Sequence, residues 1–151
     1  MTEPVPSQYL ARKTSARIEL IASSFERLVG RPLVAQGADV VSALWNAPRA
    51  ILAHGTEADP LFFFGNSYAL EVFESDLAHF LGMPSRHSAE APLREERQAL
   101  LDRVTRDGFI DDYSGIRITA TGRRFRIEGA IVWNLVDAQG ARHGQAATFA
   151  L

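Results

Sequence analysis

The last third of the chain alternates apolar and polar side chains with a period of two residues. The alternation is longest from Arg124 to Leu135, and a shorter stretch precedes it from Ile116 to Thr119. Thr121-Gly122 lies between the two stretches and Asp137–Gly140 follows the longer one, and such residues favour tight turns between antiparallel strands. Because a period of two places successive side chains on opposite faces of a sheet, we predict three long antiparallel strands, the last over residues 144–151.

The longest of these strands has one strongly apolar face if its alternation is uninterrupted. In that arrangement Ile127 and Trp133 lie on the same face, while Arg126 and Asn134 lie on the other. The pattern leaves open which of the two faces points into the protein.

Helical periodicity replaces this pattern at the other end of the chain. From Ser7 to Val29, apolar residues recur mostly at intervals of three and four, and Gly30 and Pro32 stop the run. We therefore predict an amphipathic helix of about six turns. A second, short helix is predicted from Asp39 to Trp45.

The middle of the chain predicts two short strands and then three helices. The strands cover Arg49–His54 and Leu61–Phe64. Asn66 is a suitable N-cap for the first helix and Ser75 for the second, and a charged helix covers residues 92–107. This order predicts an α+β fold, in which an antiparallel sheet has its helices inserted between strands two and three.

The length of 151 residues corresponds to one domain, since domains typically contain roughly 100–200 residues. We divide it into a flexible tail over residues 1–6, an N-terminal helical extension over 7–47 and a core over 48–151. The core and part of the extension would form a single unit over about 20–150.

Composition excludes several kinds of chemistry. The chain has no cysteine, which rules out disulfides, thiolate zinc sites, iron–sulfur clusters and cysteine nucleophiles, and which suits a cytoplasmic location. Its four histidines show no pair at the spacing of metal ligands, so we predict no metal site. The net charge of −2 argues against nucleic acid as a partner. The N-terminus has no signal peptide and no run of 18 apolar residues occurs, so neither secretion nor membrane insertion is expected.

The amino-acid sequences of several segments resemble those of known proteins. Residues 66–85, NSYALEVFESDLAHFLGMPS, resemble the PAS superfamily, in which an Asn-capped short helix follows the second strand. The match is more specific to the stand-alone bacterial form of the MEKHLA domain, a PAS-related family that also occurs at the C-terminus of certain plant homeodomain–zipper transcription factors. The segments that carry it are ALWNAP (43–48), ADPLFFFGN (58–66), DGFIDDYSGIRITATGRRFRIE (107–128) and VWNLVDAQGARHGQAATF (132–149).

This resemblance covers residues 20–150 and implies a PAS-like five-stranded antiparallel sheet, with helices over one face and a ligand cavity between them. It leaves no segment for a kinase, cyclase or DNA-binding effector, so we expect any signal to leave through a surface. The function it implies is a sensory or small-ligand-binding module without catalysis, which acts through a protein partner or as a homodimer formed by the N-terminal helix.

A cavity in such a fold would draw on the strands, the short helices and the charged helix. Small-molecule sites are largely apolar with a few convergent polar groups, and the candidate lining residues are His54, Phe64, Tyr68, Arg126, Trp133, Asn134 and Gln145. Arg117 and Arg126 are also candidates for anchoring an anionic ligand through the guanidinium fork. The ligand would be a small organic molecule or a non-covalently held flavin. A cysteinyl–flavin adduct is excluded. Haem is disfavoured because an axial histidine would have to lie on the charged helix over residues 92–107 that lines the cavity, whereas His79 and His87 come before that helix.

Two alternatives remain open from the sequence. One is a small α+β cavity enzyme of the isomerase or hydrolase type, with Asp112, His54 and Tyr113 as acid–base groups. The common nucleophile, phosphate-loop, dinucleotide and zinc-protease motifs are all absent. The other alternative is a protein-interaction module with a filled core and no ligand.

Overall fold

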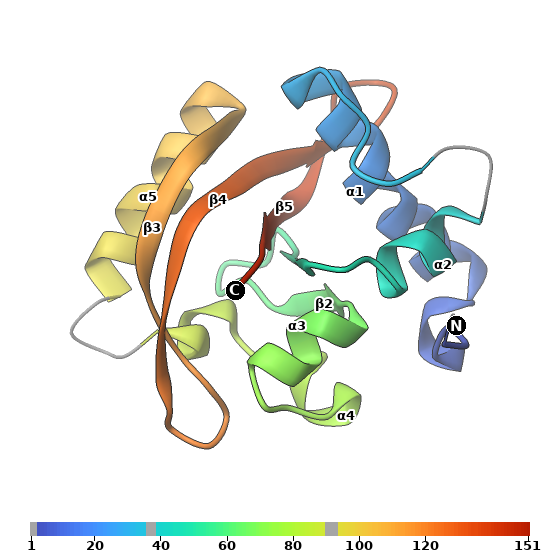
Figure 1. Cartoon of the computed structure of the whole chain (residues 1–151). Coiled ribbons are helices and arrows are strands. Elements are labelled where there is room, and N and C mark those ends of the chain that lie inside the picture. The colour runs from blue at the N-terminus through green and yellow to red at the C-terminus, as the bar shows by residue number, and fades with distance from the viewer. Residues whose placement is uncertain (1–2, 36–38, 90–93) are drawn as a thin grey trace.

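A computed structural model of the protein describes residues 3–35, 39–89 and 94–151. It confirms the predicted α+β fold, with a five-stranded sheet in the spatial order β2-β1-β5-β4-β3 (Figure 1). All neighbouring strands are antiparallel. The strands are β1 (Ala50–His54), β2 (Phe62–Gly65), β3 (Phe109–Ile118), β4 (Arg124–Val136) and β5 (Arg142–Phe149).

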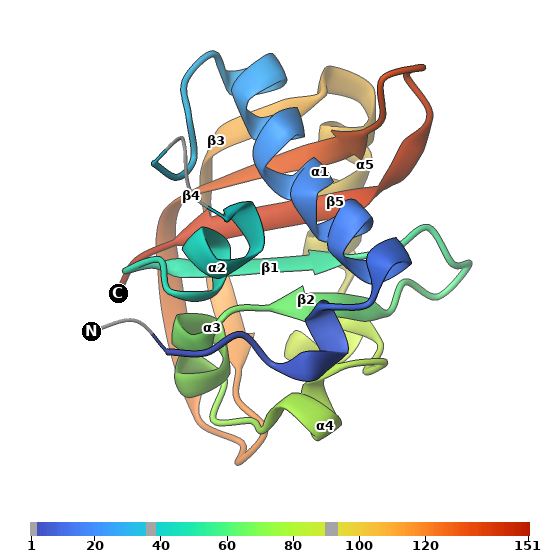
Figure 2. The same ribbon diagram turned by 90° about the vertical axis from the view of Figure 1, so that its right-hand side faces the viewer.

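Helices cover both faces of this sheet. Figure 2 shows α1 and α2 in front of the strands and α5 behind them. Among residues 3–35, 39–89 and 94–151, no helix has the length and apolar character needed to cross a membrane. The helical elements are η1 (Ser7–Tyr9), α1 (Arg12–Val29), α2 (Val40–Trp45), α3 (Ser67–Val72), α4 (Leu77–Phe80), η2 (Ser85–Ser88) and α5 (Arg94–Asp107).

The apolar stripe of α1 packs on β4. Ile18, Ile21 and Phe25 are almost fully buried, and the Phe25 ring meets the edge of Trp133 at a centroid distance of 4.9 Å. The indole Nε1 of Trp133 donates a 3.1 Å hydrogen bond to the carbonyl oxygen of Ile21. Burying each such side chain stabilises the fold by about 1.5–3 kcal/mol, so α1 is an integral layer of the fold.

The N-terminal helix is shorter than predicted. The run expected from Ser7 to Val29 divides into η1 and α1, because Ala11 has an extended backbone. The turn between them lets Tyr9 reach β2, where its hydroxyl donates to the Gly65 carbonyl oxygen at 2.9 Å and accepts from the Gly65 amide at 3.1 Å. β2 is an edge strand, and Tyr9 satisfies backbone groups that its neighbour β1 does not reach.

The segment expected as a tail contacts the rest of the protein at Glu3. The Glu3 amide donates to Asn46 Oδ1 at 2.7 Å, and Asn46 Nδ2 donates to the Glu3 carbonyl oxygen at 3.1 Å. Residues 1–2 lie outside the described residues, and so do residues 92 and 93 of the predicted helix over 92–107. The described part of that helix is Arg94–Asp107.

Two short helices between β2 and β3, namely α3 and α4, begin with side-chain caps. The Asn66 cap is confirmed, since its Oδ1 accepts from the Ala69 amide at 2.9 Å. The predicted Ser75 cap is wrong by one residue, because Asp76 Oδ1 accepts from the His79 amide at 2.7 Å. The side-chain Nδ2 of Asn66 also donates to the carbonyl oxygens of Leu44 and Arg49, which joins α2 to the sheet.

The prediction of one uninterrupted alternation along β4 is wrong. Between Ile127 and Ala130 the register with β3 shifts by one residue, and Gly129 there has a φ of 64°. A bulge of this kind moves every later side chain to the opposite face. Ile127 therefore lies on the α3 and α4 side of the sheet, whereas Trp133 packs under α1.

Candidate functional site

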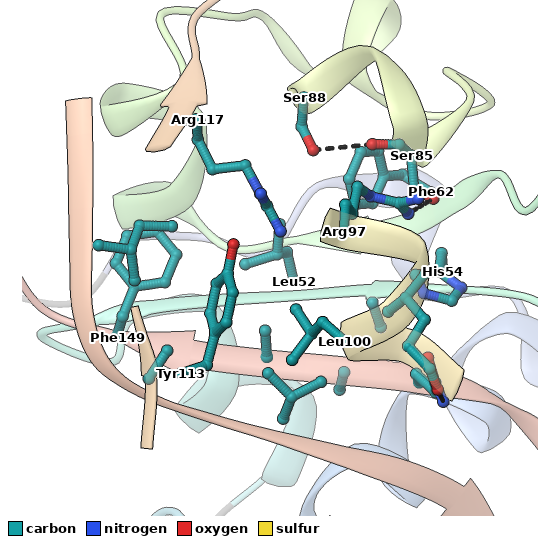
Figure 3. A pocket seen from close by; sticks show the side chains of 18 of the residues that line it. Leu52, His54, Phe62, Ser85, Ser88, Arg97, Leu100, Tyr113, Arg117 and Phe149 are labelled. Carbon is teal, nitrogen blue, oxygen red and sulfur yellow. Dashed lines mark hydrogen bonds between the residues drawn. The ribbon is translucent and has the colours of Figure 1, made fainter. Parts of the chain in front are cut away.

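A cavity lies between the sheet and the helices that follow β2. Figure 3 shows its lining, which is mostly apolar with a polar group of residues toward η2. The apolar lining includes Leu52, Phe62, Phe73, Leu100, Ile127, Val132 and Phe149, and the polar lining is His54, Ser85, Ser88, Arg97, Tyr113, Arg117 and Gln145. Small-molecule sites in proteins usually combine apolar walls with a few polar groups in this way.

Arg97 enters the cavity from α5 and is only 6% exposed. It occupies the apolar stripe of the helix, at three and seven residues before Leu100 and Val104. Its Nη2 donates a hydrogen bond to the Ser85 hydroxyl of η2, and Ser88 Oγ donates to the Ser85 carbonyl oxygen at 2.7 Å. Burial above all, and then the nearby charge of Arg117, lowers the pKa of Arg97 to about 10, so the guanidinium remains protonated at neutral pH.

Arg117 and Tyr113 come from β3. The Arg117 guanidinium lies 5.1 Å from the centroid of the Tyr113 ring, and the Tyr113 hydroxyl points toward it in Figure 3. Burial lowers the pKa of Arg117 and raises that of Tyr113, so the tyrosine is neutral when the arginine is charged. The pair is a cation beside an aromatic ring and a neutral hydroxyl.

His54 ends β1 and is 7% exposed. Its Nδ1 lies 3.0 Å from the Gly55 carbonyl oxygen, so Nδ1 carries the proton and donates. Nε2 is then an acceptor, and it is buried without a hydrogen-bond partner in the described part of the chain. Burial, the largest cause, lowers the pKa of His54 to about 4, and the imidazole is neutral at pH 7.

Gln145 and Asn134 link α5 to the sheet through side-chain hydrogen bonds. Gln145 Nε2 lies 3.1 Å from Asn134 Oδ1 and 3.0 Å from Thr105 Oγ1. Asn134 Nδ2 donates to the Val104 carbonyl oxygen at 3.1 Å. Both amides are therefore committed to structural hydrogen bonds, although Gln145 also lines the cavity.

The structure brings only some of the predicted site residues together. His54 and Gln145 line the cavity, whereas Asn134 does not line it and accepts a hydrogen bond from Gln145. Phe64 and Trp133 pack on the α1 side of the sheet, Trp133 because of the bulge at Gly129.

The two remaining predicted residues lie away from the cavity wall. The Tyr68 hydroxyl accepts from the Leu151 amide at 3.0 Å. Arg126 is exposed and pairs with Glu128 at 2.9 Å. The acid–base set of the enzyme alternative is also divided, because Asp112 is exposed and pairs with Arg103 at 3.1 Å, outside the residues that line the cavity.

Among the polar residues that line the cavity, the sequence analysis missed Ser85, Ser88 and Arg97. Arg97 belongs to the predicted charged helix, and charged side chains of a helix usually lie on its solvent-facing side, yet Arg97 is buried. A signal was present, since Arg97 shares the spacing of the apolar positions Leu100 and Val104. A charged residue on the apolar stripe of a helix marks either a buried pair or a binding site.

The cavity volume of about 60 Å³ restricts its occupant. At roughly 10–15 Å³ for each water-sized position, it has room for a molecule of on the order of four or five non-hydrogen atoms. Pockets for drug-sized ligands measure about 300–1,000 Å³. A flavin or a haem does not fit this cavity, and neither His79 nor His87 lines it. Within the described ranges, no three His, Asp or Glu side chains gather as they would around a metal ion.

A second, open groove adjoins the cavity between α5 and β3. It has a volume of about 520 Å³ and shares with the cavity the residues Arg97, Leu100, Tyr113 and Arg117. Arg103 and Arg126 lie along its outer part. The shared residues form the wall between the groove and the cavity.

The solved structures most similar to this fold include several PAS domains. A PAS domain from Colwellia psychrerythraea has a TM-score of 0.60 at 12% identity and covers 72% of this chain and 91% of its own. The light-state dimer of the fungal blue-light photoreceptor Vivid has a TM-score of 0.59 at 13% identity, with coverages of 85% and 91%. A PAS domain in complex with ethanol, from a LuxR-family transcriptional regulator of Burkholderia thailandensis, has a TM-score of 0.56 at 16% identity, with coverages of 71% and 92%. These likenesses confirm the PAS-like fold.

Curated relatives match by sequence. The homeobox-leucine zipper protein HOX29 of Oryza sativa subsp. indica is 27% identical over 101 residues, which are 67% of this chain and 12% of that protein. ATHB-14 of Arabidopsis thaliana is 25% identical over 118 residues, which are 77% of this chain and 14% of that protein. The chain thus spans about an eighth of the relatives' length. The family model of the MEKHLA domain matches residues 15–151, and the chain belongs to the MEKHLA domain family.

Proposed function

We propose that this chain is a sensory module that binds a small molecule in the cavity between its sheet and α5, without catalysis. The observation that carries the proposal is a cavity in which apolar walls meet a buried cation, Arg97. Such convergence is the usual composition of a ligand site. The PAS domain solved with ethanol supports a very small occupant in a fold of this kind.

The signal would pass to a protein partner or to a second copy of the chain, in the cytoplasm. The wall formed by α5 and β3 is a suitable element for this purpose, because it contacts both the cavity and the outer groove. The apolar stripe of α1 is already covered by the sheet, so a second copy would meet the polar side of that helix.

Native mass spectrometry of the gently purified protein, compared with the denatured protein, tests this proposal. A reproducible additional mass that is lost on denaturation is expected, and the same spectra report the number of chains in the complex. The matched variants are Ala130→Leu, which fills the cavity, and Ala78→Leu, which lies on the exposed side of α4.

We expect the additional mass to disappear in Ala130→Leu and to persist in Ala78→Leu. A folded Ala130→Leu protein that retains the mass would show that the ligand binds elsewhere. If Ala130→Leu does not fold, Ala147→Val reduces the same cavity by less.

A further inference from the structure

Two arginines at the polar end of the cavity, Arg97 and Arg117, form no ion pair with any acidic residue that the structure describes. Arg97 bonds to the Ser85 hydroxyl, and Arg117 Nη1 lies 3.4 Å from the Ile116 carbonyl oxygen. In the described ranges no carboxylate oxygen lies within 4.0 Å of either guanidinium. By contrast, their neighbours Arg86, Arg103 and Arg126 each have an acidic partner.

The acidic groups near these arginines in the described part of the chain do not supply the missing negative charge. Asp59 influences Arg97 electrostatically but pairs with Arg86 at 3.1 Å. Glu96 influences Arg117 from the exposed side of α5 without forming an ion pair with it. Tyr113 is neutral, because burial raises the pKa of its hydroxyl.

An unbalanced buried cation is costly, and arginine does not relieve the cost by losing its proton at neutral pH. Arg117, which is partly buried and lies near Arg97, adds mutual repulsion. An anion placed between them removes both costs and forms charge-assisted hydrogen bonds, for which the guanidinium fork matches a carboxylate in two-point contact. The charge pattern therefore specifies an anionic group at this end of the cavity.

The rest of the cavity specifies what the anionic group is attached to. The remaining walls are largely apolar, with leucine, valine and phenylalanine side chains. A phosphate would turn charged oxygens toward these walls, which is unfavourable. A carboxylate with a short alkyl tail satisfies both ends, and a volume of about 60 Å³ limits the tail to very few carbons.

We propose that the cavity binds a free short-chain monocarboxylate, with its carboxylate between Arg97 and Arg117 and its alkyl tail against the apolar walls. This inference rests on the proposed function, since it names the ligand class of the same cavity. The ligand enters from the groove between α5 and β3, whose wall contains both arginines. Arg103 and Arg126 of that groove are paired with acidic residues, so the attraction for an anion comes from Arg97 and Arg117 in the wall.

Calorimetric titration of the full chain tests the proposal with sodium propionate, propionamide, 1-propanol and sodium phosphate, at equal ionic strength in a buffer free of carboxylates. Propionate and propionamide have nearly the same shape and differ in charge. We expect propionate to bind at least tenfold more tightly than propionamide, and phosphate to bind no more tightly than propionamide.

Arg117→Met removes one cation, and Arg123→Met is its matched control, because Arg123 is exposed and pairs with Glu74 away from the cavity. We expect Arg117→Met to weaken propionate binding at least tenfold and Arg123→Met to change it less than twofold. Arg117→Lys keeps the charge without the fork and should give an intermediate loss. If Arg117→Met does not fold, the comparison of propionate with propionamide on the unaltered protein still decides the question.

The outcomes separate this inference from the proposed function. Equal affinities for propionate and propionamide, or binding of 1-propanol alone, would overturn the carboxylate inference and leave a ligand-binding cavity. Unchanged propionate affinity in a folded Arg117→Met protein would also overturn it. The absence of binding by all four compounds, together with no additional mass in the native spectra, would overturn both.

Discussion

At the scale of single residues, His54 connects the cavity wall to the pH dependence of folding. Its imidazole is buried, and burial lowers its pKa from 6.5 to about 4. The unfolded chain therefore takes up a proton as the pH falls through about 6.5, while the folded protein does not until the pH approaches 4. Because the unfolded state then binds more protons, folding stability falls over this interval.

We expect the free energy of unfolding to decrease by on the order of 3 kcal/mol between pH 6.5 and pH 4 on account of His54. His54→Gln should remove most of that slope, measured by urea unfolding at a series of pH values. The same substitution at His79, which is exposed on α4, controls for the loss of an imidazole elsewhere. An unchanged slope in His54→Gln would mean that other groups cause the acid sensitivity.

Arg97 shows, also at the scale of single residues, why some site residues cannot be predicted from the sequence. Its guanidinium is buried because Ser85, twelve residues earlier, supplies a hydrogen-bond partner and the cavity supplies space. Neither is visible in the pattern of α5 itself, where Arg97 is one charge among many. What the pattern does contain is the spacing of Arg97 relative to Leu100 and Val104, and that spacing is a usable signal for a buried charge.

At the scale of elements, two glycines decide how β4 and β5 fit into the sheet. Gly129 forms the bulge of β4 with a φ of 64° and open space around it. Gly144 in β5 has a φ of 141°, and a Cβ there would overlap the carbonyl oxygen of His54 in β1. The first glycine relieves only backbone strain, whereas the second also permits a close approach between strands.

Alanine substitutions should separate these two roles. Gly129→Ala should lower the free energy of unfolding by about 1–2 kcal/mol, which is the cost of a Cβ at positive φ. Gly144→Ala should cost a further 1–3 kcal/mol, because the strands must move apart. Urea unfolding followed by tryptophan fluorescence measures both, and equal losses would contradict the assignment of a close approach at Gly144.

The bulge also limits how well faces can be predicted from a strand's alternation. The alternation from Phe125 to Ile127 and that from Ile131 to Leu135 share one odd-numbered register in the sequence. Nothing in that register marks a change of face, although Gly129 is a residue at which bulges form. The one-residue insertion relative to β3 places Trp133 under α1 and leaves Val132 to line the cavity.

At the scale of the whole molecule, the N-terminal helix and the sheet share one hydrophobic core. Residues of α1 and α2 form a single buried cluster with residues of β1, β2, β4 and β5. The division between an extension over 7–47 and a core over 48–151 therefore does not correspond to separate packing units. The unfolding of the two parts should be cooperative.

Phe25→Ala tests this cooperativity. We expect it to reduce the free energy of unfolding by about 3–5 kcal/mol, since it leaves a cavity against Trp133. Leu10→Ala, at an exposed position just before α1, should change it by less than about 0.5 kcal/mol. Circular dichroism and tryptophan fluorescence should report one shared transition in each protein, and two separate transitions would show that α1 unfolds independently.

The amino-acid sequence by itself determined the fold class, the order of the elements, the Asn66 cap and the positions of the turns, because these depend on local periodicity and turn chemistry. Its motifs also indicated the family. Only the tertiary structure decided the contents of the cavity, because these depend on contacts between residues far apart in the chain. The bulge at Gly129 determines which side chains of β4 face the cavity. The packing of η2 against α5 places the Ser85 hydroxyl where Arg97 can donate a hydrogen bond to it. No local pattern shows that Arg97 and Arg117, which lie on different elements, come together at one end of the cavity, where neither forms an ion pair with an acidic residue of the described ranges.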